Sequence, residues 1–248
     1  VTVKGSGTSL LPSSPVESLH TIPMEREALV DNEERDTGYD YLVKVLMLGD
    51  DSVGKSSLLT RYVEGSFRLD TLSTIGVDFK SKDVGVGNMR VRLQIWDTSG
   101  QQRYMSITKT YFRLVSCVLL VYDTCSRQSF DNLAYWREVL SANVCDPSLI
   151  LHTVLVGTKT DRGGDREVST ETGAAYAKEN SMMYVETSAL EGTNVSSAFH
   201  PLAHAVCADI ESGRVGDGVF TPYLEHSDSE GGAVHVEAAR EERVSRCF

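Results

Sequence analysis

The sequence lacks the features that mark membrane, secreted and nucleic-acid-binding proteins. No apolar run approaches the roughly 20 residues that a membrane-spanning helix needs, and no charged segment followed by an apolar one opens the chain as in a secretory signal. Its five cysteines form no C-x-x-C pair and no metal-ligand spacing. Lysine and arginine total 24 against 35 aspartates and glutamates, and this net charge of −11 argues against nucleic acid as the main partner. We therefore expect a cytoplasmic protein with reduced thiols.

Polar, glycine- and serine-containing segments flank a more regular centre. Residues 1–40 are rich in Ser, Pro, Gly and acidic residues without a sustained period, which predicts a disordered N-terminal extension. Residues 213–248 return to this composition and are predicted to be a flexible tail. The 41% hydrophobic content of the chain is enough for a real core, and we expect one folded domain over residues 41–212.

The central region alternates strand-like and helix-like segments. Apolar or alternating runs predict strands over 41–48, 78–86, 90–97, 115–122, 149–157 and 182–186. Helical spacing of apolar residues predicts helices over 56–63, 126–143, 170–179 and 194–210. Strands that alternate with helices predict an α/β fold, with a mostly parallel six-stranded sheet, helices on both faces, and ligands at the carboxyl ends of the strands.

The first predicted strand leads into a loop with a phosphate-binding pattern. Residues 49–56 fit G-x-x-x-x-G-K-[ST], in which backbone N–H groups and a helix N-terminus enclose phosphates. In that pattern Lys55 neutralises the outer phosphates and the Ser56 hydroxyl meets Mg²⁺. The alternative for the loop alone is a glycine turn between a strand and a helix. The predicted nucleotide-binding residues here are Gly49, Asp51, Ser52, Val53, Gly54, Lys55, Ser56 and Ser57.

A second motif ends a strand that comes later in the chain. Asp97 ends the predicted strand 90–97, where a carboxylate can hold Mg²⁺ through water. Gly100 follows, where a glycine N–H can approach the terminal phosphate. Asp is common wherever strands stop, so this fragment alone has a purely structural alternative.

Two more motifs follow the last two predicted strands of the chain. Asp161, in Thr158-Lys159-Thr160-Asp161, offers a carboxylate that can accept from the N1–H and the 2-amino group of guanine. Adenine has no such donor pair on that edge, so the site should prefer guanine. Ser188 and Ala189 end the next strand and can add a backbone N–H to the guanine carbonyl. In order and on the right elements, the motifs together predict a guanine-nucleotide site.

On these residues the chain resembles the small GTPases of the Ras superfamily, and within it the Rab family, over residues 41 to about 210. Residues 74–79, Thr-Ile-Gly-Val-Asp-Phe, match the Rab effector-loop signature, residues 92–97 the strand before the second switch, and residues 119–123 a third Rab segment. The resemblance implies a P-loop GTPase fold and a Mg²⁺-dependent switch. Such a switch hydrolyses GTP to GDP and recruits effectors for vesicle traffic in its GTP form.

The resemblance also assigns roles residue by residue. Thr74 would give its hydroxyl to Mg²⁺ and its N–H to the γ-phosphate, Phe67 would lie against the guanine, and Gln101 would orient the attacking water. The implied metal ligands are Ser56, Thr74 and Asp97, and the implied catalytic residues are Gln101 and Lys55. The implied effector-binding residues are Ile75, Phe79, Trp96 and Tyr111, with core packing as the alternative for Phe79, Trp96 and Tyr111.

Several positions depart from the family pattern. Asp51 and Ser52 stand where the family has a small side chain and a glycine, and the Asp51 carboxylate adds like charge and bulk near the γ-phosphate. We therefore weigh a hydrolysis-impaired GTP-binding scaffold against the hydrolysing switch, with a P-loop ATPase as a distant third. Thr158 replaces the usual asparagine of the guanine motif, and Gln102 replaces a glutamate that commonly helps exchange factors. Pro201 falls inside the last predicted helix and should bend it.

The C-terminal end and the expected partners complete the interpretation. Cys247 lies one residue before the end, where Rab proteins usually have paired cysteines, so the alternatives are prenylation and an ordinary thiol. One lipid would give weak, reversible membrane binding. We expect a monomer that binds guanine nucleotide, effectors, an exchange factor and a GTPase-activating protein, and that cycles between cytoplasm and the cytosolic face of the endoplasmic reticulum, Golgi or vesicles.

Overall fold

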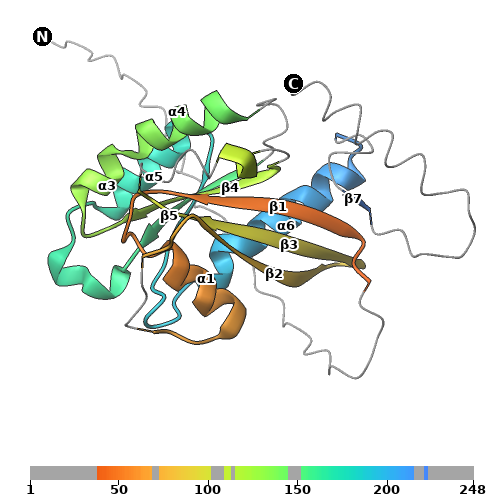
Figure 1. Ribbon diagram of the computed structural model, residues 1–248, viewed down its shortest axis with the longest axis horizontal. Coiled ribbons are helices and arrows are strands. Elements are labelled where there is room, and N and C mark those ends of the chain that lie inside the picture. The colour runs from red at the N-terminus through yellow and green to blue at the C-terminus, as the bar shows by residue number, and fades with distance from the viewer. Residues whose placement is uncertain are drawn as a thin grey trace, which may run out of the picture. The chain divides into compact units, whose positions relative to one another are not determined.

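A mixed β-sheet organises the fold (Figure 1). The computed structural model of the chain describes residues 38–68, 73–101, 109–112, 115–144, 152–214 and 221–222. These residues belong to one unit that begins at Gly38. The predicted N-terminal extension up to residue 37 and the tail beyond residue 222 lie outside the described residues, so predictions for them stay predictions.

The strands follow the order β2-β3-β1-β4-β5-β6. Their bounds are β1 (Tyr41–Leu48), β2 (Val77–Val86), β3 (Met89–Thr98), β4 (Cys117–Asp123), β5 (His152–Thr158) and β6 (Met183–Glu186). β2 and β3 form an antiparallel hairpin, and every other neighbouring pair in this order is parallel. The predicted six-stranded, mostly parallel sheet is confirmed. A two-residue strand, β7 (Thr221–Pro222), pairs antiparallel with the start of β1 and was not predicted.

Helices cover both faces of the sheet, as predicted (Figure 1). Among the described residues, the α-helices are α1 (Lys55–Glu64), α3 (Arg127–Asp131), α4 (Leu133–Asn143), α5 (Thr170–Glu179) and α6 (Val195–Glu211). In the described ranges, the short 3₁₀ helices η2 (Lys109–Phe112) and η4 (Thr160–Asp165) follow β3 and β5 along the chain. No helix among the described residues is long and apolar enough to cross a membrane.

The alternation of side chains along β1 creates the two cores. Val45 and Met47 pack with Leu58 of α1 and Phe199 of α6 on one face. Leu46, which points the opposite way, belongs to the cluster that includes residues of α3, α4 and α5. The helices that contribute to these two clusters cover both faces of β1. β1 also lies between β3 and β4, so its carboxyl end places the next loop near the middle of that end of the sheet.

One predicted helix differs in detail from the structure. The predicted helix 126–143 is divided into α3 and α4 at Asn132, whose backbone stays close to helical geometry (φ −75°, ψ −4°) while its side chain bonds elsewhere. Ser126 caps α3 by accepting from the N–H of Ser129. α6 continues through Pro201 to Glu211, close to the predicted bounds, and the bend predicted at Pro201 stays a prediction. The remaining element bounds agree with the predictions to within one to three residues wherever the residues are described.

Candidate nucleotide-binding site

The loop after β1 is shaped by two glycines with positive φ. At Gly49 (φ 146°) a Cβ would lie 2.1 Å from the carbonyl oxygen of Val121 in β4, so no larger residue fits there. Gly54 (φ 99°) is the N-cap of α1 and supplies no side chain to cap it. Within the part of the chain that the structure describes, the first N–H groups of α1 therefore have no intrahelical acceptor and no capping side chain, which is the arrangement that binds phosphates at helix N-termini.

Lys55, the first residue of α1, is fixed inside this loop. Its Nζ donates to the carbonyl oxygens of Gly49 (2.8 Å) and Asp50 (2.7 Å), and the residue is 5% exposed. Burial lowers the pKa of Lys55, and the carboxylates of Asp97 and Asp51 oppose that shift. With two of its three N–H groups held by the loop, the ammonium can offer the third to a phosphate oxygen.

The three predicted metal ligands come from distant segments and meet beside Lys55. The hydroxyls of Ser56 and Thr74 lie 2.7 Å apart, and both donate to Oδ2 of Asp97, with 3.3 Å from Thr74. Oδ1 of Asp97 is buried and has no hydrogen-bond partner among the described residues. Burial raises the pKa of Asp97, while Lys55 and the two hydroxyls act in the opposite sense. Hydroxyl and carboxylate oxygens are the donors that Mg²⁺ prefers, so this set fits the ion.

The two predicted base-recognition segments are joined to each other. Ser188 Oγ donates to Oδ1 of Asp161 at 2.5 Å, and the N–H of Thr160 donates to the carbonyl of Thr187 at 3.3 Å. Asn194 at the N-cap of α6 donates from its side chain to the carbonyl of Glu186 (2.9 Å) and so holds the start of the second segment. The predicted residue Ala189 is half-buried directly after Ser188.

The base segment is also joined to the phosphate loop. The Thr158 hydroxyl bonds the carbonyls of Val53 (2.5 Å) and Tyr122 (3.0 Å), so it links the loop to β4. Lys159, held at φ 61°, donates to the carbonyl of Ser52 (2.7 Å) and pairs with Asp123 at 2.7 Å. Sequence reasoning missed Asp123, although it ends a wholly apolar run just as Asp97 ends its strand.

Gly100 and Gln101, which follow β3 and begin the implied second switch, contact the phosphate loop. A Cβ at Gly100 would come within 2.1 Å of the backbone of Asp50 and Asp51, so this contact requires glycine. Nε2 of Gln101 donates to Oδ2 of Asp51 at 3.0 Å. The residue that departs from the family pattern therefore contacts the residue implied to orient water. Gln102 lies outside the described residues.

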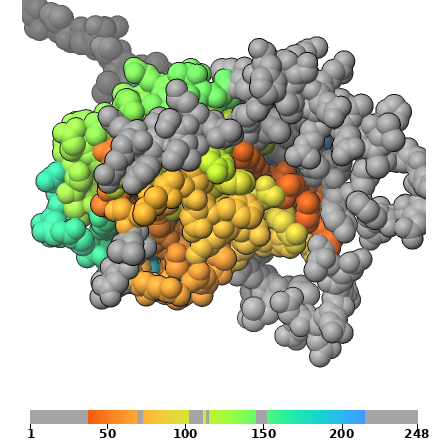
Figure 2. All heavy atoms as spheres, viewed as in Figure 1, coloured from red at the N-terminus to blue at the C-terminus, as the bar shows by residue number. Residues whose placement is uncertain are grey.

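Three of the four implied effector residues, Phe79, Trp96 and Tyr111, form one aromatic row on β2, β3 and η2. The Phe79 and Trp96 rings have centroids 4.7 Å apart, and the Trp96 and Tyr111 rings 4.9 Å. Ile75 is 81% exposed and Phe79 44%, while Trp96 and Tyr111 are half-buried. The face drawn in Figure 2 includes much of the surface of β2 and β3. Trp96 is therefore part of a surface row and not only of the core.

Two further predicted site residues, Phe67 and Cys247, stay predictions. Within the described ranges, no hydrogen bond or ring contact links Phe67 to the base segments, and its role against guanine stays a prediction. Cys247 lies outside the described residues. The sequence also did not predict the contacts of Asp50 with Asn132 and Trp136, because only the fold brings these residues to the loop.

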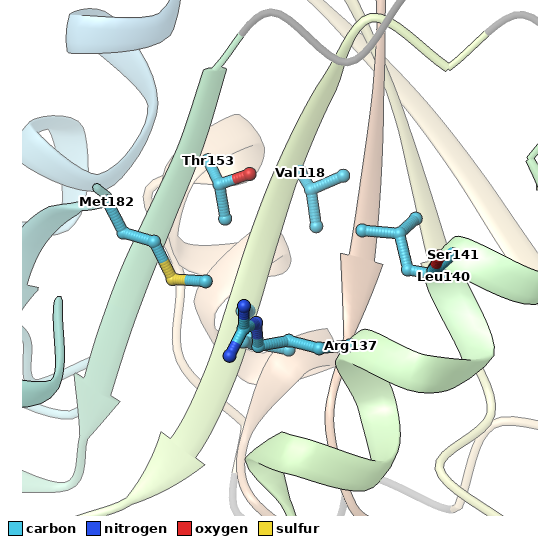
Figure 3. A pocket seen from close by; sticks show the side chains of 7 residues that line it. Val118, Arg137, Leu140, Ser141, Thr153 and Met182 are labelled. Atoms are coloured by element: carbon cyan, nitrogen blue, oxygen red, sulfur yellow. The ribbon is translucent and has the colours of Figure 1, made fainter. Parts of the chain in front are cut away.

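A pocket of about 270 Å³ lies between α4 and strands β4 and β5 (Figure 3). Its lining is Val118, Leu120, Arg137, Leu140, Ser141, Thr153 and Met182. Val118 and Thr153 stand at the amino ends of β4 and β5, whereas the phosphate and base segments follow the carboxyl ends. Among the described residues, none of those predicted to bind nucleotide lines this pocket, so we do not assign it to the site.

Comparisons with known proteins agree with this geometry. A sequence profile of the Ras family matches residues 44–208. Ras-related protein Rab-4B of Rattus norvegicus is 41% identical over 186 residues, which cover 73% of this chain and 86% of that protein. Ras-related protein RABA1b of Arabidopsis thaliana is 46% identical over 161 residues (65% and 73%), and GTP-binding protein ypt3 of Schizosaccharomyces pombe is 43% identical over 161 residues (65% and 74%). The phosphate loop, the joined base segments and these matches together establish that the chain belongs to the Rab family of Ras-type small GTPases.

Proposed function

We propose that this GTPase is a Mg²⁺-dependent switch that cycles between GTP and GDP and recruits effectors in vesicle traffic. The observation that carries the proposal is the contact of Ser56, Thr74 and Asp97 beside the buried Lys55. These oxygens come from α1, from the segment before β2 and from the end of β3. A nucleotide with Mg²⁺ would therefore hold all three segments at once.

Each residue has a distinct task in the proposed hydrolysis. Mg²⁺, when bound by Ser56, Thr74 and Asp97, supplies charge neutralisation on the phosphates. Lys55 adds a fixed positive charge, and the N–H groups at the start of α1 bind phosphate oxygens. Gln101 orients the attacking water once its amide leaves Asp51. The intrinsic rate is slow, and an arginine supplied by an activating protein could add about 10³–10⁵ in rate.

The proposed switch is the ordering of two segments by the γ-phosphate. Thr74 and Gly100 would both donate an N–H to that phosphate and release it after hydrolysis. The change would move the aromatic row of Phe79, Trp96 and Tyr111, which we propose as the effector surface together with Ile75. A ligand shifts such an equilibrium only through contacts that differ between the two states.

A second candidate function is a GTP-binding scaffold with impaired hydrolysis. The contact of Gln101 with Asp51 favours it, because the amide that should orient water is bonded to a carboxylate. Such a protein would remain in the GTP state and hold effectors without turnover. The two functions differ in the hydrolysis rate and share the same nucleotide site.

Other parts of the proposal concern domains, membranes and partners. We propose that residues 41–212 form the GTPase domain, with tails on both sides, and that the protein acts as a monomer with an exchange factor and an activating protein. Prenylation of Cys247 would give reversible attachment to endomembranes. Localisation of a tagged protein with and without Cys247 tests that attachment.

Nucleotide specificity tests the proposed site directly. Because Asp161 would accept from two guanine donors, the purified protein should bind GDP far more tightly than ADP in a competition titration. Asp161→Asn should weaken GDP binding and admit xanthine nucleotides, whose 2-position carries an oxygen in place of the amino group. Equal affinity for GDP and ADP would contradict the proposed function.

A further inference from the structure

Asp50 lies in the phosphate loop, and its carboxylate is hydrogen-bonded to the start of α4. Its Oδ1 accepts from Nε1 of Trp136 at 2.7 Å, and its Oδ2 accepts from Nδ2 of Asn132 at 2.7 Å. Its backbone carbonyl accepts from Nζ of Lys55, also at 2.7 Å. One residue therefore connects the start of α4 to the lysine of the phosphate site.

The two donors are themselves held in place. Trp136 is 1% exposed in α4, and its ring packs edge-on against Tyr135, with centroids 5.4 Å apart. Gln128 donates to Oδ1 of Asn132 at 3.0 Å, which turns the amide nitrogen of Asn132 toward Asp50. Fixed donors of this kind bind a carboxylate without losing further freedom, so they define where its charge lies.

The position of the Asp50 carboxylate matters because the loop is proposed to bind negatively charged phosphates. Asp50 and Asp51 bring two adjacent negative charges to a site for a polyanionic ligand, and like charges repel strongly away from bulk water. Asp51 is exposed, whereas Asp50 is half-buried and close enough to Lys55 to affect its pKa. If its donors were lost, the Asp50 carboxylate could turn toward Lys55 and compete with phosphate for that ammonium.

We propose that Trp136 and Asn132 are positioning residues for the phosphate site and act through Asp50. They hold its carboxylate against α4, so that its charge stays away from the phosphates and its carbonyl faces Lys55. This inference rests on the proposed nucleotide site and adds two residues, on an element outside the recognised motifs, that set its affinity.

A comparison of two backgrounds tests the inference. In the otherwise wild-type chain, Trp136→Phe removes the indole N–H and keeps a ring, and it should weaken binding of fluorescently labelled GDP by roughly tenfold, the loss typical of a bond to a charged group. Asn132→Ala, at a half-buried position, should act in the same direction and serves if Trp136→Phe does not fold. Tyr135→Phe is the matched control on the same helix and should bind within about twofold of wild type, because it leaves both bonds to Asp50 in place.

The same substitutions are then repeated in an Asp50→Asn chain. A neutral side chain needs no neutralisation and repels no phosphate, so each substitution should now change GDP binding by about twofold or less. A loss of equal size in both backgrounds would show a packing defect and overturn the inference, as would wild-type affinity in both Trp136→Phe and Asn132→Ala. Failure of the wild-type chain to bind GDP would instead contradict the proposed function.

Discussion

Replacement of Asp51 by glycine should make this protein a faster GTPase. In the structure the amide of Gln101 donates to Oδ2 of Asp51 at 3.0 Å, so the group that must orient water is bonded to a carboxylate. Glycine has no acceptor at this place and restores the small residue that the family usually has there. Gln101 would then be available to the attacking water.

The size of the effect follows from that hydrogen bond. A bond to a charged group contributes about 1.5–3 kcal/mol when it is protected from water. Asp51 is exposed, so we reduce this contribution to about 1 kcal/mol for solvent screening. A free energy of about 1 kcal/mol corresponds to roughly a fivefold change in rate. Repulsion between the carboxylate and the charge that develops on the phosphates acts in the same direction, so fivefold is a lower bound.

Single-turnover hydrolysis at saturating Mg²⁺ measures this effect. Asp51→Gly should accelerate it by about fivefold or more, and Gln101→Leu should slow it. Asp51→Asn keeps the volume and an acceptor but removes the charge, so its rate should lie between those of wild type and Asp51→Gly. In a Gln101→Leu chain, Asp51→Gly should give a smaller gain, because only the repulsion between the carboxylate and the phosphates is then relieved.

Two outcomes would refute this reasoning. An unchanged rate in Asp51→Gly would mean that the carboxylate limits neither Gln101 nor the reaction, and the scaffold alternative would lose the residue that motivates it. An equal gain with and without Gln101 would place the effect on the phosphates and not on the hydrogen bond.

Three further predictions concern the switch and the fold. Hydrogen exchange should show residues 68–80 and 98–112 protected with a GTP analogue and open with GDP, and equal protection in both states would argue against a switch. Gly100→Ala should abolish the difference in protection between the two nucleotide states for residues 98–112, because a Cβ there would lie 2.1 Å from the Asp50 backbone. GDP binding should stay within a few-fold of wild type. Protection that still differs between the states would contradict the close contact of Gly100 with the phosphate loop. Burial lowers the pKa of Lys44 to about 8, against about 10.4 for an unfolded lysine. Between these two pH values the unfolded chain binds more protons than the folded chain. The contribution of Lys44 to the free energy of unfolding therefore rises with pH across that window. Lys44→Met should therefore raise the urea midpoint below pH 8, with a gain that shrinks toward pH 10.4, and a gain independent of pH would contradict the burial of the charge.

Much of the fold was predictable because local signals agreed with one another. The apolar run of β1, the glycine loop and the helical spacing after it each specify their own element, and the order of strands and helices then fixes the sheet type. The alternation in β2 and β3 and the turn residues at Gly87 are typical of the hairpin that the structure contains. Sequence could not predict β7, since a two-residue pairing with Tyr41 and Leu42 has no periodicity to detect.

The site was predictable to the extent that its residues lie in short motifs. The meeting of Asp97 with Ser56 follows from strand order, because the carboxyl ends of parallel strands share one edge. The bonds of Thr158 to Val53 and Tyr122 explain how a hydroxyl occupies a position where the family has an amide. The partners of Asp50 were not predictable, because Trp136 is 86 residues away in sequence and looks like an ordinary core residue of an amphipathic helix.

The positions of the two tryptophans make the protein its own optical reporter. The chain has only Trp96 and Trp136. Trp96 lies in the aromatic row between Phe79 and Tyr111, and Trp136 bonds the loop residue Asp50. Emission from Trp136 should therefore respond to events at the phosphate loop, and emission from Trp96 to a partner that covers the row. In stopped-flow experiments, the intrinsic fluorescence of variants with a single tryptophan would report each event separately and without a label.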